Sequence, residues 1–213
     1  YSGEKCRIRC TLIGRVDVMR LDFSGDRVLA IVAHPDDAEL LCAGTLARAK
    51  ADGAAIAICV LCKGEKGQPA RPIRNLAAVR RKEMAAAARL LGANLFRCEF
   101  GDGELVDIPI QRKKAIEIVR QFRPTLVLAH SPDDYHSDHR AAAALAEAAS
   151  WYCSSGGHKT HSPVLESQPA LWRMDCVNMS GFEPSFCVDI SDYVELKRQM
   201  LRCHTSQLQR FVA

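Results

Sequence analysis

The segment from His34 to Asp37 reads His-Pro-Asp-Asp and stands where the chain leaves an apolar stretch, residues 28–33. At this point of an α/β protein, a nucleotide-binding chain carries glycines, because glycine lets backbone N–H groups approach a phosphate. This chain instead places an imidazole and two carboxylates there, which repel phosphate and attract a divalent cation. The residue types therefore predict a metal site after the first strand.

A second acidic, histidine-rich segment runs from His130 to His139 and follows another apolar stretch, residues 125–129. His136 and His139 are three residues apart at an expected helix start, so both rings can face one side. Together, the two segments can supply two imidazoles and a carboxylate with open coordination positions, the donor set of a catalytic zinc site. Asp36 is placed to accept a proton from a water that such a metal activates. The pattern predicts metal-assisted hydrolysis.

Each segment also has a structural interpretation. The first can cap a helix, since acidic residues stabilise a helix N-terminus. The second can be a capped helix that carries surface histidines. Two such segments at equivalent ends of two strands in one small domain favour the metal site over both structural interpretations.

The rest of the chain alternates between apolar strands and helices that must position these segments. Strands are expected at residues 28–33, 55–61, 94–100 and 125–129, with later ones around 170–176 and 186–188. Helices are expected at residues 38–51, 75–91, 110–122, 136–151 and 191–204. Continuously apolar strands followed by helices indicate a parallel sheet covered on both faces. We predict an α/β, Rossmann-like single domain with a mostly parallel sheet, partly mixed near its edge.

Composition narrows the function classes. The chain has 213 residues, 48% apolar and 25% charged, with a net charge of +4, which is ordinary for one globular domain. Its ten cysteines are dispersed, often in apolar segments, and indicate small buried side chains and a cytoplasmic location. Cys59 and Cys62 have CxxC spacing, but strand alternation sends their sulfurs to opposite faces. That placement disfavours a chelate or a redox pair.

The sequence pattern disfavours two further classes, membrane-spanning proteins and nucleic-acid-binding proteins. No apolar run is long enough to span a membrane. Aromatic residues are sparse near the basic stretch at 71–82, so a stacking platform for nucleic acid is not expected. Residues 1–18 are weakly patterned, and Met19 reads as the true start, so residues 1–18 are expected to be an extension outside a domain at 19–213.

The motifs resemble those of the LmbE-like family, also called the PIG-L family, whose members are zinc-dependent N-acetylglucosaminyl deacetylases. The signature segments are Ala33-His-Pro-Asp-Asp-Ala-Glu39 and Tyr135-His-Ser-Asp-His139. Further matching segments lie at 64–67, 80–83, 101–105, 188–192 and 204–207. The resemblance covers residue 19 to the C-terminus. The later motifs most resemble the branch that deacetylates GlcNAc-malate in bacillithiol synthesis.

The resemblance implies a ligand set and a base. By position, His34, Asp37 and His139 bind the metal, which is zinc or another divalent cation such as Fe²⁺. Asp36 is the general base for the attacking water. The family also implies a Rossmann-like fold and a homo-oligomer, and its members commonly continue beyond the last motif, so the domain is expected to be incomplete at its C-terminus.

The resemblance also implies roles for residues around the metal. His136 is expected to be the protonated group that stabilises the oxyanion and assists the leaving amine, with Asp138 orienting or tuning it. Tyr135 is expected to reach the oxyanion. A sugar-contacting arginine is expected at Arg80, with Arg81 as the alternative.

The implied function is hydrolysis of the N-acetyl group from a GlcNAc-containing small molecule. Two alternatives stay open: a same-fold amidase that acts on another conjugate, such as a mycothiol-type one, and a metal-retaining binding protein without catalysis. Asp36 favours an active enzyme, since a degenerate member could keep the ligands and drop the base. A nucleotide-binding Rossmann module is excluded, because GxGxxG is absent after the first strand.

Overall fold

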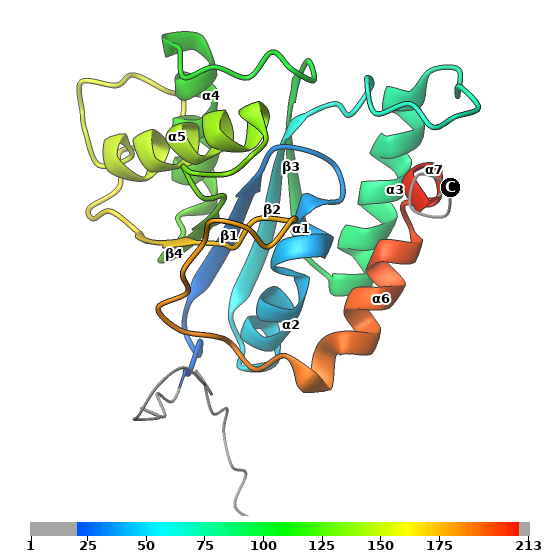
Figure 1. Ribbon diagram of the computed structural model, residues 1–213. Coiled ribbons are helices and arrows are strands. Elements are labelled where there is room, and N and C mark those ends of the chain that lie inside the picture. Colours follow the sequence, from blue (N-terminus) through cyan, green and yellow to red (C-terminus); the bar gives the residue numbers. More distant parts are fainter. Residues whose placement is uncertain (1–20, 209–213) are drawn as a thin grey trace, which may run out of the picture.

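Five strands form one parallel sheet in the order β3-β2-β1-β4-β5 (Figure 1). The computed structural model describes residues 21–208. The strands are β1 (Arg27–Val32), β2 (Ala55–Cys62), β3 (Asn94–Phe100), β4 (Leu126–Ala129) and β5 (Ala170–Arg173). β1, β2 and β4 are buried almost throughout, as their continuous apolar sequence requires. The predicted α/β architecture is confirmed.

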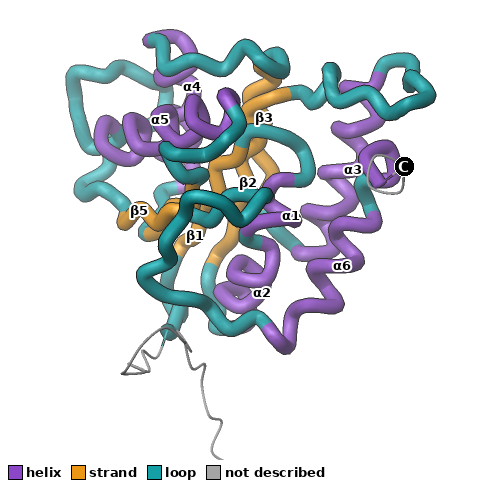
Figure 2. Tube along the Cα trace, viewed as in Figure 1, coloured by secondary structure: helices purple, strands orange, loops and turns teal. Residues whose placement is uncertain are grey.

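Helices cover both faces of the sheet, and Figure 2 shows the strands lying between them. One layer holds α4 (Pro109–Phe122) and α5 (Ser137–Tyr152). The other holds α1 (Asp37–Leu41), α2 (Ala43–Ala51), α3 (Leu76–Leu91) and α6 (Val194–Arg202). Along β1, Leu29 and Ile31 face the first layer, while Val28 and Ala30 face the second. This alternation gives the domain one apolar core on each side of the sheet.

The last part of the described chain differs from expectation. Residues 186–188 do not form a strand, and the Phe186 ring packs edge-on against Trp172 of β5, with 4.8 Å between ring centroids. The sheet is therefore wholly parallel, not partly mixed. The helix expected at 191–204 is a short 3-10 turn, η1 (Ser191–Tyr193), followed by α6 and then by α7 (Thr205–Leu208).

Two local expectations are also corrected. The helix expected at 38–51 is divided into α1 and α2, because Cys42 leaves helical geometry at φ −136°. Cys59 and Cys62 are buried as predicted, but they pack in the same apolar cluster and not on opposite faces. The pairing of β2 with β3 shifts between Val60 and Cys62, which breaks the alternation.

The strand order sets the place of the site. β1 and β4 are neighbours, with Ile31 opposite Ala129, so the segments that follow them leave the sheet side by side. The segments after β2 and β3 close the adjacent part of the same edge. The extension expected at 1–18 lies outside the described residues, as does the end of the chain beyond residue 208. Among the described helices, none combines the length and apolarity needed to cross a bilayer.

Candidate active site

Asp37 is the side chain on which the predicted ligands converge. It opens α1, it is 4% exposed, and its Oδ2 accepts a 2.7 Å hydrogen bond from the backbone N–H of His34. The same oxygen lies 3.4 Å from Nδ1 of His34 and 3.4 Å from Nε2 of His139. Donor atoms arranged tetrahedrally around zinc at about 2.0–2.1 Å are roughly 3.3 Å apart. The three residues therefore fit a single divalent cation.

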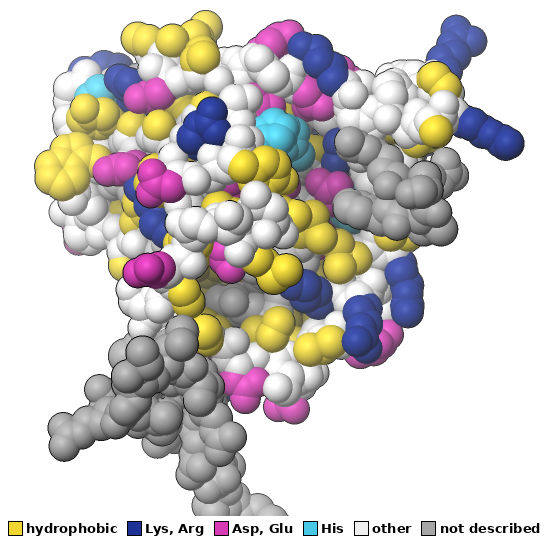
Figure 3. Space-filling view, viewed as in Figure 1, with side chains coloured by type: hydrophobic (Ala, Val, Ile, Leu, Met, Phe, Trp, Pro, Cys, Tyr) yellow, Lys and Arg dark blue, Asp and Glu magenta, His cyan; other side chains and the backbone are white. Residues whose placement is uncertain are grey.

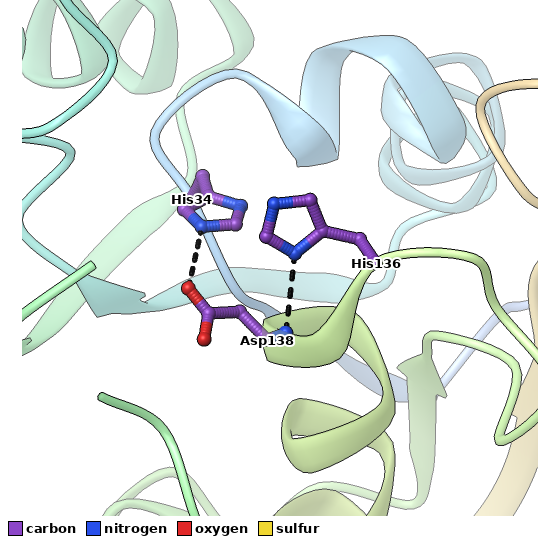
Figure 4. A group of neighbouring side chains, drawn as sticks. All are labelled: His34, His136 and Asp138. Carbon is purple, nitrogen blue, oxygen red and sulfur yellow. Dashed lines mark hydrogen bonds and ion pairs between the residues drawn. The ribbon is translucent and has the colours of Figure 1, made fainter. Parts of the chain in front are cut away.

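A carboxylate behind the ring orients His34. Nε2 of His34 lies 3.0 Å from Oδ2 of Asp138 (Figure 4). The same oxygen accepts a 2.7 Å hydrogen bond from the N–H of Gly103. The contact with Asp138 places a proton on Nε2 of His34 and leaves Nδ1 facing Asp37. Burial alone would lower the pKa of His34, but its bonds to Asp138 and Asp37 raise it to about 10. A metal ion must therefore displace a proton from this ring.

His136 lies beside His34, but its hydrogen bond and the direction of its pKa shift differ from those predicted. Its Nδ1 caps α5 by accepting a 3.1 Å hydrogen bond from the backbone N–H of Asp138, so a proton can sit only on Nε2 (Figure 4). Burial and the charges of His34 and His139 lower the pKa of His136. This arrangement holds a neutral imidazole where a charged one was expected. The Asp138 carboxylate contacts His34, not His136.

Asp36 stands beside the three ligands and is paired with an arginine. Its Oδ1 lies 3.0 Å from Nη2 of Arg80. Burial raises the pKa of Asp36 to about 6; the charge of Arg80 opposes that shift, and Asp37 adds to it. The carboxylate is therefore mostly ionised at neutral pH and still basic enough to accept a proton. Its backbone is left-handed, φ 114°, a strained conformation for a residue other than glycine.

The two candidate arginines are in different environments. Arg80 is 3% exposed, lines the cleft, and donates to the carbonyl oxygens of Pro35 and Gly64. It thus holds together the loops that follow β1 and β2. Arg81 is exposed and pairs with Glu99 of β3 at 2.6 Å. Arg80 is the arginine at the site, and most of its donors already face protein oxygens.

A cleft of about 630 Å³ lies over these residues, within the size range of small-molecule sites. Its walls also include Leu40, Lys66, Gly67, Tyr135, Val177 and Gln207. Tyr135 is 54% exposed, which places it at the rim. In the space-filling view, histidine side chains (cyan) are open to solvent on this face, with acidic and basic side chains nearby (Figure 3).

Two buried residues of the second segment are absent from the predicted site. His130 is fully buried; its Nε2 accepts the N–H of Ala33 at 3.1 Å and lies 3.3 Å from Oδ2 of Asp37. Asp134 is also buried, with Oδ2 lying 3.1 Å from Nδ1 of His139. Their place in a histidine-rich segment at a strand end was the available signal. The sequence does not distinguish such support from an exposed loop.

Glu83 is a third addition to the site and lies one turn after Arg80 on α3. Its carboxylate accepts hydrogen bonds from the Thr205 hydroxyl (2.8 Å), the Ser206 N–H (2.8 Å) and the Ser206 hydroxyl (2.6 Å). The adjacent Gln207 lines the cleft and donates a 3.0 Å hydrogen bond to the loop after β2. Glu83 therefore fixes the C-terminal helix α7 as part of the cleft wall.

Curated proteins with similar sequences include enzymes of two kinds. Diacetylchitobiose deacetylase of Thermococcus kodakarensis is 29% identical over 191 residues, which cover 85% of this chain and 70% of that protein. The 4-oxalmesaconate hydratase of Pseudomonas putida is 26% identical over 188 residues, covering 84% of this chain and 73% of that protein. Similarity of this degree therefore does not by itself fix the reaction.

A solved structure has a similar fold, and a family model matches the part of the chain that carries the candidate site. The crystal structure of a conserved protein from Thermus thermophilus has a TM-score of 0.75 and 36% identity, and the match covers 85% of this chain and 79% of that one. The family model described as PIG-L, GlcNAc-PI de-N-acetylase, matches residues 29–150, more than half of the chain. That range contains both segments that converge on Asp37. The chain belongs to the PIG-L family of de-N-acetylases.

Proposed function

We propose that this protein is a metal-dependent deacetylase that removes the N-acetyl group from a GlcNAc-containing small molecule. The geometry around Asp37 carries the proposal: donor atoms of His34 and His139 each lie 3.4 Å from its Oδ2. Asp36 stands beside them without joining the ligand set. A cation and a separate basic carboxylate are the two parts that hydrolysis of an amide by water requires.

Zinc is the first candidate for the ion, because two imidazoles and one carboxylate leave a coordination position open. Fe²⁺ and other divalent cations accept the same donors. When bound, such an ion would polarise the acetyl carbonyl group and make a water molecule more acidic.

The side chains around the ion would move the protons. Asp36 accepts one proton from the attacking water and, with a pKa of about 6, can pass it to the departing nitrogen as the C–N bond breaks. His136 donates its Nε2–H to the acetyl oxygen, where negative charge develops. Asp138 supports the reaction through His34, whose Nε2 it contacts. Acetate and a free amine are the products.

The substrate class rests on the relatives and on the cleft. The family model is named for a GlcNAc-containing lipid, and one relative is named for diacetylchitobiose. A cleft of about 630 Å³ has room for an amino sugar and part of its aglycone. We assign the sugar contact first to Tyr135 at the rim, with Arg80 forming the wall below. A cytoplasmic location and a homo-oligomer stay predictions.

The catalytic proposal is tested with a deacetylase assay at defined metal content. The substrates are GlcNAc conjugates that carry malate, inositol or a second GlcNAc, and the variant is Asp36→Asn. We expect wild type to release acetate and free amine in equal amounts from one of these classes, and the variant to lose at least about 100-fold in kcat. Equal turnover by the variant and wild type would refute the role of Asp36 as general base. If metal-loaded wild type releases no acetate from any of these conjugates, the proposed deacetylase activity is refuted.

Metal content provides an independent test of the division of roles. We expect His139→Ala to lose the bound ion, because a ligand is removed, and Asp36→Asn to retain it. Metal is measured by elemental analysis after gel filtration. The same loss in both variants would contradict the separation of ligand from base.

A further inference from the structure

His139 makes polar contacts on both sides of its ring. Nε2 lies 3.4 Å from Oδ2 of Asp37, inside the proposed metal site. Nδ1 lies 3.1 Å from Oδ2 of Asp134, on the side away from the cleft. The side chain of His139 is 3% exposed and that of Asp134 is 0% exposed, so water does not compete for this second contact.

The Asp134 carboxylate is itself held in place. Its Oδ1 accepts a 2.9 Å hydrogen bond from the backbone N–H of His136, and the Cys176 thiol also hydrogen-bonds the carboxylate. The carbonyl oxygen of Asp134 accepts a 2.8 Å hydrogen bond from Arg140. The carboxylate is therefore fixed relative to the turn from which α5 begins.

We infer that Asp134 is a positioning residue for the metal ligand His139. By accepting the proton of Nδ1, it holds the ring in the tautomer whose Nε2 lone pair faces Asp37. A negative charge behind a ligating imidazole also makes that imidazole a better donor. The inference rests on the proposed metal site. Each histidine ligand then has a carboxylate on the ring nitrogen that faces away from the ion: Asp138 contacts His34, and Asp134 contacts His139.

A second metal ion is the competing interpretation of this cluster. His130, Asp134 and His139 each offer a donor atom, and the three atoms lie within 4.8 Å of one another. The rings of His130 and His139 are stacked, however, 4.1 Å between centroids and 17° from parallel. Imidazole lone pairs lie in the ring plane, so one ion cannot lie in both of these planes. The 3.1 Å contact between Nδ1 of His139 and Oδ2 of Asp134 pairs these two residues directly with each other.

The variant that tests the inference is Asp134→Asn. The amide keeps an oxygen that can accept the N–H of His136, so the turn before α5 is preserved. Its NH₂ group faces Nδ1 and donates to it, which forces the proton of His139 onto Nε2, the nitrogen needed by the metal. We expect zinc affinity to fall by about 10- to 100-fold. Asp133→Asn, one residue earlier and exposed, is the matched control and should bind zinc like wild type.

Zinc dissociation constants are measured on the full chain, stripped of metal, by competition with a chromophoric chelator. The protonated nitrogen of His139 is identified by ¹⁵N NMR in wild type and variant, and thermal unfolding without metal reports any general loss of stability. A purely structural role would lower the melting temperature without a selective loss of zinc affinity.

The outcomes separate this inference from the metal site itself. A wild type that binds no divalent cation refutes the proposed site. Equal zinc affinity in wild type and Asp134→Asn refutes only the positioning role. If the variant fails to fold, the NMR spectrum of zinc-loaded wild type still decides, because an Nδ1 of His139 that carries no proton overturns the inference.

Discussion

Oδ1 of Asp36 lies 3.0 Å from Nη2 of Arg80, and both side chains are largely buried. The guanidinium opposes the rise in pKa that burial imposes on the carboxylate. Because Arg80 also donates to the carbonyl oxygens of Pro35 and Gly64, the group that tunes the base is fixed to the loops that carry it. Arg80 therefore affects both the basicity and the position of Asp36.

Arg80→Gln should move the acid limb of the kcat/KM profile to higher pH. The base must be ionised to act, and removing the neighbouring positive charge raises the pKa of Asp36 above its value of about 6. We expect a shift of about one pH unit or more. The measurement is a pH series of kcat/KM, with Arg81→Gln as the matched control, because Arg81 pairs with Glu99 away from the cleft. An unmoved acid limb in Arg80→Gln would contradict the electrostatic coupling.

Glu83→Gln should weaken both the fold and substrate binding. The buried carboxylate accepts three hydrogen bonds from Thr205 and Ser206, and an amide cannot accept all of them. We expect a loss of about 1–3 kcal/mol in the free energy of unfolding and a higher KM, because the adjacent Gln207 lines the cleft. Urea unfolding and steady-state kinetics check this, with exposed Lys82→Gln as control. A stability loss at unchanged KM would limit Glu83 to a structural role.

Gly44→Ala should destabilise the protein although alanine favours helices. A Cβ at Gly44 of α2 would lie 2.5 Å from Cδ1 and 2.7 Å from Cβ of Ile190, and the latter atom cannot rotate away. Overpacking of about 1–3 kcal/mol outweighs a gain in helix propensity of about 1 kcal/mol. Melting temperatures are compared with those of Gly156→Ala, where a Cβ meets nothing within 4 Å. Equal melting temperatures in the two variants would show that the segment around Ile190 can move away from the new Cβ without a measurable loss of stability.

Glu117→Gln should remove a pH-dependent part of the stability. Burial would raise the pKa of Glu117, but hydrogen bonds from Ser162 and His161 lower it overall. A lowered pKa in the folded state stabilises the fold above the ordinary glutamate value, and this contribution fades as the pH falls through the lowered pKa. We expect the variant to be less stable by about 1 kcal/mol at pH 7, with the difference shrinking toward pH 3. Urea unfolding across that range, with exposed Glu166→Gln as control, tests it; a difference independent of pH would exclude the charge as its source.

β1, β2 and β4 were predictable because each is an apolar run that turn-forming residues end. β3 also contains polar residues, but it lies between turn signals at Gly92 and Gly101. The expected ranges agree with β1 to β4 to within one residue at each end. The strand expected at 186–188 was wrong because a short run of consecutive apolar residues does not distinguish pairing in a sheet from packing on it. Phe186 packs on Trp172 instead. The choice between Arg80 and Arg81 follows from helix phase, since Leu76, Arg80 and Glu83 share the buried face of α3.

The residue types that supply donor atoms at the site could also be predicted from the sequence. The contact that each histidine ring nitrogen makes could not. His34 and His139 each lie in a segment that follows a parallel strand. They meet at one edge of the sheet because those strands, β1 and β4, are neighbours. Residue spacing does not show that Asp138 contacts a histidine 104 positions earlier in the chain and not His136, two positions away. That choice depends on how the turn before α5 directs each side chain. The supporting roles of His130 and Asp134 are hidden for the same reason, since burial in a loop is set by tertiary packing.

The register of β1 with β4 has a consequence for the order of assembly. His34 and Asp37 are neighbours in the chain, but His139 joins them only after those two strands have paired. An incompletely folded chain therefore offers a cation two weak donors and no complete coordination sphere. Because segments distant in the chain meet late in folding, tight uptake of an ion during refolding should accompany the pairing of these two strands and not precede it.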